Sequence, residues 1–216
     1  MKKEALNTIL TVAMLMVFIL LVVLLINSTI FKNEVRAANF QDVPETHWAH
    51  DHIIQMQAYG IINGYEDGTF KPENELKTGE FIKMVATVVY PNYEFKTPKN
   101  GEHWSRQYVD SLSSYYLNKW EYDSAKLESY ITREEAAQII WRLYNTDDKD
   151  LEVNKNNEYV NKYSDADEIT KESYRFYIDC CTKYGLINGF EDGTFRPQGT
   201  LTRAQAAKLL RLVMGV

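Results

Sequence analysis

One thirteen-residue segment occurs twice in this sequence, first as Gly60-Ile61-Ile62-Asn63-Gly64-Tyr65-Glu66-Asp67-Gly68-Thr69-Phe70-Lys71-Pro72 and then, 125 residues later, as Gly185-Leu186-Ile187-Asn188-Gly189-Phe190-Glu191-Asp192-Gly193-Thr194-Phe195-Arg196-Pro197. Ten of the thirteen positions are identical, and the other three exchange similar side chains. The same offset continues without a gap into the next segment, where Leu76 matches Leu201. Similarity at a fixed offset is the signature of a repeat architecture, so the fold is built from copies of one element.

A weaker copy is visible between these two. His103-Trp104-Ser105 echoes His47-Trp48-Ala49, and Ile131-Thr132-Arg133-Glu134-Glu135-Ala136-Ala137 echoes Leu201-Thr202-Arg203-Ala204-Gln205-Ala206-Ala207. This middle copy lacks the Asp-Gly-Thr-Phe turn, and polar connectors rich in turn residues flank it at 91–102 and 145–163. We therefore divide the chain into copy one (residues 38–95), a degenerate copy two (residues 96–146) and copy three (residues 160–216).

Copies one and three are each expected to form a helix, a loop and a second helix. The first helix carries apolar residues at helical spacing and ends at a glycine, Gly60 or Gly185. The loop turns at Asp-Gly, and its phenylalanine, Phe70 or Phe195, is expected to pack back into the core. The expected core positions are Trp48, Ile53, Met56, Tyr59, Phe81, Val85 and Val88 in copy one, and Tyr174, Ile178, Cys181, Tyr184, Ala206, Leu209, Leu210 and Val213 in copy three.

The size of the chain favours one compact body built from all three copies. With 216 residues and 45% apolar content, the chain has no room for two large independent cores. Two short helices bury too little apolar surface to be stable alone, so the copies should pack on one another. The sequence thus predicts a mainly α fold of three helix-loop-helix repeats.

The first 37 residues are set apart by their composition. Lys2 and Lys3 precede an apolar run at 9–26, which is followed by Val35-Arg36-Ala37-Ala38. This is the pattern of a secretory signal cleaved after Ala37, but about 18 apolar residues are also enough to span a bilayer. Residues 1–37 are therefore predicted to be a signal peptide or a membrane anchor helix. Both readings place the chain from residue 38 onward outside the membrane.

Charge and cysteine content exclude several classes of function. The formal net charge is −6, and removing residues 1–37 takes away four bases and two acids, which makes it −8. Such a chain should repel nucleic acid. The two cysteines, Cys180 and Cys181, are neighbours on an expected helix, where they point about 100° apart, so no disulfide framework follows. No second Cys or His pair stands at zinc-ligand spacing, and we expect neither a metal nor a cofactor.

The repeated motifs resemble the S-layer homology module, by which many bacterial surface proteins attach to the cell wall. Its pattern is approximately Phe-x-Asp-Val, His-Trp-Ala, the glycine loop, and Ile-Thr-Arg-Ala-Glu-Phe. Copy one supplies Phe40-Gln41-Asp42-Val43, His47-Trp48-Ala49, the full loop and Leu76-Lys77-Thr78-Gly79-Glu80-Phe81. The resemblance implies three modules in a pseudo-threefold helical prism with ligand grooves between neighbours. It also implies a secondary cell-wall polysaccharide bearing pyruvate ketals as the ligand, and an extracellular location in the cell wall or S-layer.

Departures from this pattern in each of the three copies leave the number of working grooves open. Copy one has Thr78 where the pattern has arginine, and copy two lacks the glycine loop and a clear Phe-x-Asp segment. Copy three has Tyr163-Ser164-Asp165 in place of the first motif, and Ser173-Tyr174 where a tryptophan is expected.

The arginines are the strongest candidate ligand contacts. Thr132 and Thr202 begin capping boxes, but a cation in the first turn that follows, Arg133 or Arg203, opposes the helix dipole. An anion docked there would meet free backbone N–H groups and a guanidinium that can grip a carboxylate. We expect Arg203 to contribute more than Arg133, because copy three keeps its loop, and Thr78 to be a bystander.

Other candidates have two readings each. Trp48 and Trp104 either pack in the core or form the apolar floor of a cleft, as the family resemblance implies. Asp42 and Asp165 either cap a turn or accept sugar hydroxyls. The resemblance also places the loop glycines among the ligand-binding residues; they are Gly64 and Gly189.

No catalytic arrangement stands out in the sequence. All four histidines lie near the His-Trp motifs, and no nucleophile motif such as Gly-x-Ser-x-Gly is present. We therefore expect a non-catalytic carbohydrate-binding anchor whose partner is a cell-wall glycopolymer. The alternative is a structural protein of the surface layer that acts through contacts with other surface-layer proteins.

Overall fold

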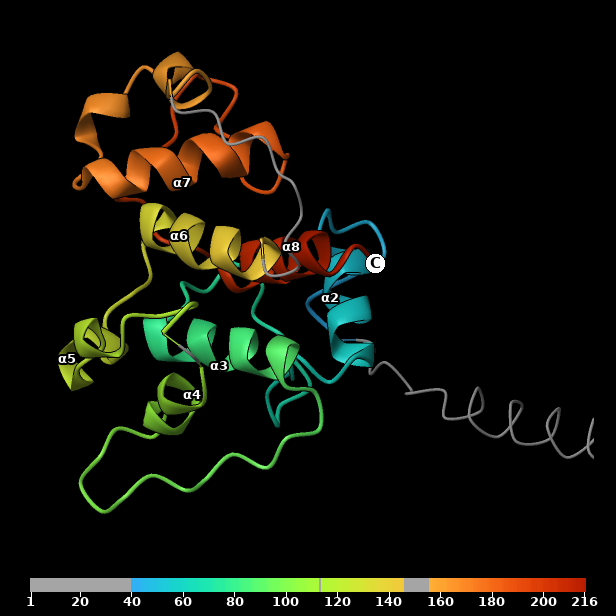
Figure 1. Ribbon diagram of the computed structural model, residues 1–216. Helices are drawn as coiled ribbons and strands as arrows, with labels where there is room; N and C mark the ends of the chain where they lie inside the picture. The colour runs from blue at the N-terminus through green and yellow to red at the C-terminus, as the bar shows by residue number, and fades with distance from the viewer. Residues whose placement is uncertain (1–39, 113, 146–155) are drawn as a thin grey trace, which may run out of the picture. The chain divides into compact units, whose positions relative to one another are not determined.

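The computed structural model describes residues 40–112, 114–145 and 156–216 (Figure 1). These residues form seven α-helices and three short 3-10 helices, with isolated β-bridges and no longer strand among them. The predicted signal or anchor at residues 1–37 lies outside the described part, in which no helix is long and apolar enough to cross a membrane. The elements are α2 (His50–Ala58), α3 (Thr78–Val89), α4 (Arg106–Ser111), η1 (Lys119–Glu121), α5 (Ser124–Glu128), α6 (Arg133–Tyr144), η2 (Val160–Lys162), η3 (Ala166–Glu168), α7 (Glu172–Lys183) and α8 (Arg203–Met214). The prediction of a mainly α fold is confirmed.

The local sequence signals set the helix ends as expected. Gly60 and Gly185 follow α2 and α7 with φ of 70° and 67°, a backbone conformation that favours glycine. At the other end, the side chains of Thr132 and Thr202 accept hydrogen bonds from backbone N–H groups at the starts of α6 and α8. The capping boxes predicted for these two helices are therefore confirmed.

A closed ring of three backbone hydrogen bonds joins the copies where their second helices begin. Leu76 N–H donates to the carbonyl of Leu201 (2.8 Å), Leu201 to Ile131 (3.2 Å), and Ile131 to Leu76 (3.1 Å). All three side chains are fully buried. Each copy thus contributes one residue to the ring, at the equivalent position, and each residue both donates and accepts.

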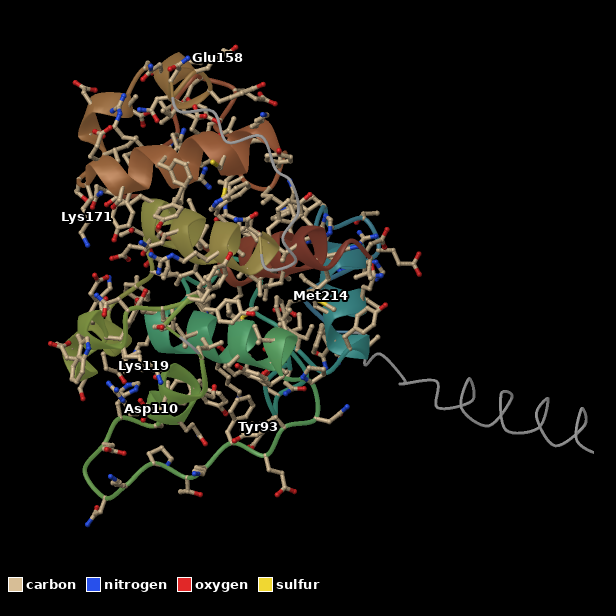
Figure 2. All side chains as sticks on the ribbon, viewed as in Figure 1. Tyr93, Asp110, Lys119, Glu158, Lys171 and Met214 are labelled. Atoms are coloured by element: carbon tan, nitrogen blue, oxygen red, sulfur yellow. The ribbon has the colours of Figure 1, made fainter. Side chains whose placement is uncertain are left out.

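The helices pack across copies. The first helix of copy one, α2, packs on α8 of copy three. In the same way α4 of copy two packs on α3 of copy one, and α7 of copy three packs on α6 of copy two (Figure 1). Every first helix therefore lies on the second helix of the preceding copy in the ring. Figure 2 shows side chains filling the layer between α6 and α7.

Most of the predicted core positions are buried; Val88, Tyr184 and Val213 are partly buried, and two positions are exposed. Phe70 and Phe195 are 1% and 0% exposed, so both loop phenylalanines pack into the core as predicted. Trp48 and Tyr59 were expected in the core, but their exposed fractions are 53% and 51%. These two residues flank α2 at its two ends rather than lying on its buried face, which carries Ile53 and Met56.

Candidate functional site

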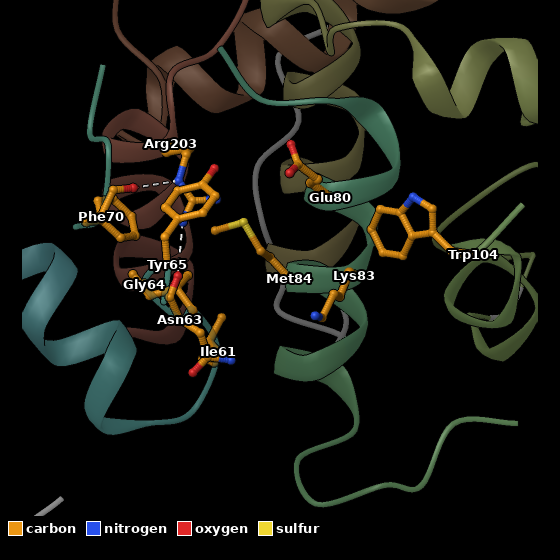
Figure 3. A pocket seen from close by; sticks show the side chains of 11 residues that line it. Ile61, Asn63, Gly64, Tyr65, Phe70, Glu80, Lys83, Met84, Trp104 and Arg203 are labelled. Atoms are coloured by element: carbon orange, nitrogen blue, oxygen red, sulfur yellow. Dashed lines mark hydrogen bonds between the residues drawn. The ribbon is translucent and has the colours of Figure 1, made fainter. Parts of the chain in front are cut away.

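Two hollows of matching construction lie between the copies. In the first, which we call groove A, the loop and α3 of copy one form the floor. Trp104 of copy two stands at one end, and Arg203 of copy three lies beside Tyr65 at the other (Figure 3). Groove A is thus assembled from all three copies.

The second hollow, groove B, repeats this arrangement with the copies exchanged. Its floor is the loop and α8 of copy three, its tryptophan is Trp48 of copy one, and its arginine is Arg133 of copy two. Most lining residues of groove B stand 125 residues after their counterparts in groove A. These pairs are Ile61 and Leu186, Ile62 and Ile187, Asn63 and Asn188, Gly64 and Gly189, Tyr65 and Phe190, Glu80 and Gln205, Lys83 and Lys208, and Met84 and Leu209.

Each arginine reaches into the loop of the next copy. Arg203 donates from Nε to the carbonyl of Phe70 (2.9 Å) and from Nη2 to that of Asn63 (3.0 Å). Its guanidinium carbon lies 4.5 Å from the ring centroid of Phe70 and 5.0 Å from that of Tyr65. Hydrogen bonds to a charged group contribute about 1.5–3 kcal/mol each, which exceeds the few tenths of a kcal/mol lost against the helix dipole. These bonds explain why a cation stands in the first turn.

Arg133 makes the same contacts in copy three. It donates from Nε to the carbonyl of Phe195 (2.8 Å) and from Nη2 to that of Asn188 (2.9 Å). Only 6% of this residue is exposed, and its burial lowers the pKa of Arg133 to about 10, which still leaves it charged at neutral pH. The sequence-based ranking of Arg203 above Arg133 assumed that each arginine serves its own loop. That assumption is wrong, because both arginines meet a complete loop in the following copy.

The backbone N–H groups at the helix starts already have partners. At α6, Arg133 N–H donates to Gly199 and Glu134 N–H to Pro197. At α8, the first two N–H groups donate to the carbonyls of Asn74 and Pro72. The expectation that a ligand anion meets free N–H groups there is therefore wrong. The cations of the grooves are therefore side chains, and Nη1 of each guanidinium takes no part in the bonds to the loop.

The tryptophans lie at the grooves rather than in the core. Trp104 is 43% exposed and Trp48 is 53% exposed, and each lines one groove. Each tryptophan follows a histidine that stacks or tilts against it, with ring centroids 5.8 Å apart for His47 and 5.5 Å apart for His103. A half-exposed indole beside charged groups suits an apolar face of a sugar ring. Of the two readings of these residues, the geometry favours the cleft.

The aspartates hold the loops in shape. The carboxylate of Asp42 accepts hydrogen bonds from the N–H groups of Phe70 (2.8 Å) and Lys71 (2.7 Å). Asp165 accepts from Phe195 and Arg196 at the same two distances. Of the two readings of Asp42 and Asp165, the geometry favours the cap of a turn over a contact with sugar hydroxyls. Their hydrogen bonds join the first motif of copies one and three to the glycine loop of the same copy.

The loop glycines combine two roles. A Cβ atom on Gly64 would lie 2.1 Å from Phe40 and 2.8 Å from the carbonyl of Thr69. On Gly189 it would lie 2.3 Å from Tyr163 and 2.6 Å from the carbonyl of Thr194. Both positions therefore require glycine for close packing, and both also line a groove.

Replacing Asp42 with asparagine should destabilise the protein, because it weakens the hold of this carboxylate on the loop of copy one. Asn keeps one acceptor but turns an NH₂ group toward a backbone donor, so we expect the free energy of unfolding to fall by about 1–3 kcal/mol. The measurement is chemical denaturation of the full chain. Asp110→Asn is the control, because Asp110 makes only an exposed ion pair with Arg106 four residues earlier, and should change stability by less than about 0.5 kcal/mol. Equal stability of Asp42→Asn and wild type would contradict this role.

Each groove also contains a lysine that the sequence analysis did not single out. Lys83 on α3 lines groove A, and Lys208 on α8 lines groove B; both are exposed. They stand five residues after the helix start in each copy, at the same 125-residue offset as the loop. Each groove thus presents a second cation.

The missing arginine of copy one, the missing loop of copy two and the missing tryptophan of copy three all fall on one position of the ring. A third groove would take its floor from copy two, its arginine from copy one and its tryptophan from copy three. Thr78 replaces the arginine and is fully buried, with its N–H on the carbonyl of Ser129. The helix α5 stands where the loop is missing, and Gln138 replaces the lysine. One groove has therefore lost its loop, arginine, lysine and tryptophan together, and the other two have kept theirs.

The last residue of α5, Glu128, links copy two to copy one. Glu128, at the end of α5, hydrogen-bonds to Nε2 of His103 at 2.6 Å and forms an ion pair with Lys77. Contacts with Lys77 and His103 hold the pKa of Glu128 below its ordinary value.

In the part of the chain that the structure describes, no three His, Cys, Asp or Glu side chains gather in a way that could hold a metal ion. Cys180 and Cys181 are both buried free thiols.

Comparisons with known proteins match both ends of the described region. The model of the S-layer homology domain matches residues 39–82 and 162–207. S-layer protein EA1 of Bacillus anthracis is 28% identical over 182 residues, which cover 81% of this chain and 20% of that protein. The cellulosome-anchoring protein of Acetivibrio thermocellus is 23% identical over 180 residues, or 79% of this chain and 37% of the relative. Exoglucanase XynX of the same species is 24% identical over 181 residues, or 81% and 16%. The chain thus spans less than two fifths of the length of each of these relatives.

Proposed function

This chain is a protein with S-layer homology domains, and from this premise we propose that it binds an anionic polysaccharide of the bacterial cell wall without covalent bonds. The observation that carries the proposal is the duplication of one groove. An arginine, a lysine, a half-exposed tryptophan and a glycine loop recur together in grooves A and B, each time drawn from three different copies. Cations beside an aromatic ring suit a sugar that carries a carboxylate, such as a pyruvate ketal.

The same premise gives the location and the class of protein. We propose that the chain acts outside the membrane, at the cell wall or S-layer, as an anchor. Some relatives are named as enzymes, but this chain covers only their S-layer homology segment, which is a non-catalytic part. We further propose that residues 96–146 are a third, degenerate module and that the three form a pseudo-threefold helical prism. The ring through Leu76, Ile131 and Leu201 supports this arrangement.

Sedimentation with isolated cell walls tests the proposal. The full chain should pellet with untreated walls and remain in solution once the secondary polysaccharide has been removed chemically from the peptidoglycan. A protein without S-layer homology domains serves as the control for trapping. If binding persists after the polysaccharide is removed, the alternative holds, in which the chain acts through contacts with other surface-layer proteins.

A further inference from the structure

The two grooves differ in charge at one position of their floor. Glu80 in groove A corresponds to Gln205 in groove B. Each side chain uses one oxygen to accept the N–H of the residue before its helix, from Lys77 at 2.9 Å and from Thr202 at 3.1 Å. The remaining atom is the acidic Oε1 in groove A and the Nε2 donor in groove B. Figure 3 shows Glu80 between the arginine and the tryptophan of groove A.

The other charged residues that line the two grooves are the same in kind. Both grooves have one arginine and one lysine. An ion pair stands beside each loop, between Lys71 and Asp67 (3.3 Å) at groove A and between Arg196 and Asp192 (2.8 Å) at groove B. The formal charge of the lining side chains is therefore +1 in groove A, from one Arg, one Lys and one Glu, and +2 in groove B, from one Arg and one Lys.

We propose, resting on the function proposed above, that the two grooves select different sugars of the polymer. Groove B prefers a carboxylated sugar to its neutral counterpart, because Nε2 of Gln205 adds a hydrogen-bond donor beside two cations. Groove A binds both with similar affinity, because the carboxylate of Glu80 repels the acid and accepts a hydroxyl instead. Glu80 and Gln205 are the residues that set this specificity.

Each groove contains its own spectroscopic reporter. The indole N–H signals of Trp104 and Trp48 can be followed separately by NMR as the full chain is titrated with a small sugar. The probe is a methyl hexoside carrying a 4,6-pyruvate ketal, and its neutral match is the 4,6-isopropylidene ketal, in which a methyl group replaces the carboxylate. With the acid, we expect the Trp48 midpoint about five- to tenfold below that of Trp104, the effect of one nearby charge in partly screened surroundings. With the neutral ketal, the two midpoints should be similar.

Reciprocal substitutions isolate the residue responsible. Glu80→Gln should strengthen binding of the acid at Trp104 by about five- to tenfold and leave Trp48 unchanged, and Gln205→Glu should weaken it at Trp48 by a similar factor. Both changes keep the size of the side chain and the oxygen that caps the helix. Equal midpoints for the acid in wild type, or midpoints that do not move in the variants, overturn this inference and leave the proposed function standing. If neither indole responds to either sugar or to fragments of the wall polymer, the proposed function fails and the inference fails with it.

Discussion

Removal of residues 163–216, which make up nearly all of copy three, should unfold the rest of the protein. The loss takes away α7 and α8, on which α6 and α2 pack, and it opens the ring at Leu201. Burying a large apolar side chain contributes about 1.5–3 kcal/mol, so Ile187, Phe195 and Leu201 alone contribute about 5–9 kcal/mol. This is a large part of the 5–15 kcal/mol by which a typical domain is stable, and the other buried side chains of copy three add to it.

Circular dichroism during heating measures this outcome. We expect no cooperative transition and little helix in the truncated chain, whereas a chain that lacks only Gly215 and Val216 should melt as wild type does. Those two residues lie after α8 and are exposed, so their loss is the matched control for shortening the chain. A sharp transition in the chain without residues 163–216 would show that copies one and two are independently stable.

Replacing both groove tryptophans with alanine should abolish wall binding while the protein stays folded. Trp48 and Trp104 are about half exposed, so their removal should change stability little. Truncating a central tryptophan of a binding site costs about 2 kcal/mol or more, which corresponds to at least about thirtyfold in affinity for each groove. Because a polymer can occupy both grooves of one chain, losing them also removes the gain from two-point attachment.

A third exposed tryptophan provides the control for this experiment. Trp120 in η1 is 93% exposed and lines neither groove. Trp120→Ala should therefore bind walls as wild type does, in the same sedimentation measurement. The tryptophans are also cleaner probes than the arginines, since removing Arg133 or Arg203 would leave two loop carbonyls without their donor. If the double variant binds walls as wild type does, neither groove is the binding site.

The elements of this fold follow from local sequence signals, but their pairing does not. The helix ends at Gly60 and Gly185 and the caps at Thr132 and Thr202 depend on residues a few positions apart, which the sequence displays directly. An internal repeat establishes which residues are equivalent without establishing which copies touch. The packing of each first helix on the preceding copy is a property of the ring, and it appears only in three dimensions.

The sequence indicated which residue types form the site, but it did not show which copies contribute them to one groove. Arg133 and Arg203 stood out as cations in an unfavourable position of the helix, but their partners lie in the loop of another copy. Lys83 and Lys208 could have been found by carrying the 125-residue comparison five positions further into the helix. They carried no distinctive signal, because lysine is the ordinary residue of an exposed helix face. The order of the copies in the ring also shows that the missing arginine, the missing loop and the missing tryptophan, which look unrelated in the sequence, belong to a single groove.

The number of binding sites tests the central claim that, in the part of the chain that the structure describes, two grooves of this kind remain, each assembled from three copies. Isothermal titration of the full chain with a single-repeat fragment of the wall polysaccharide, too short to bridge two grooves, measures this number. The account predicts two sites in wild type, one in Trp48→Ala, one in Trp104→Ala, and two in Thr78→Ala, because Thr78 is buried at the lost position. Three sites in wild type, or two sites that survive either tryptophan substitution, would contradict it.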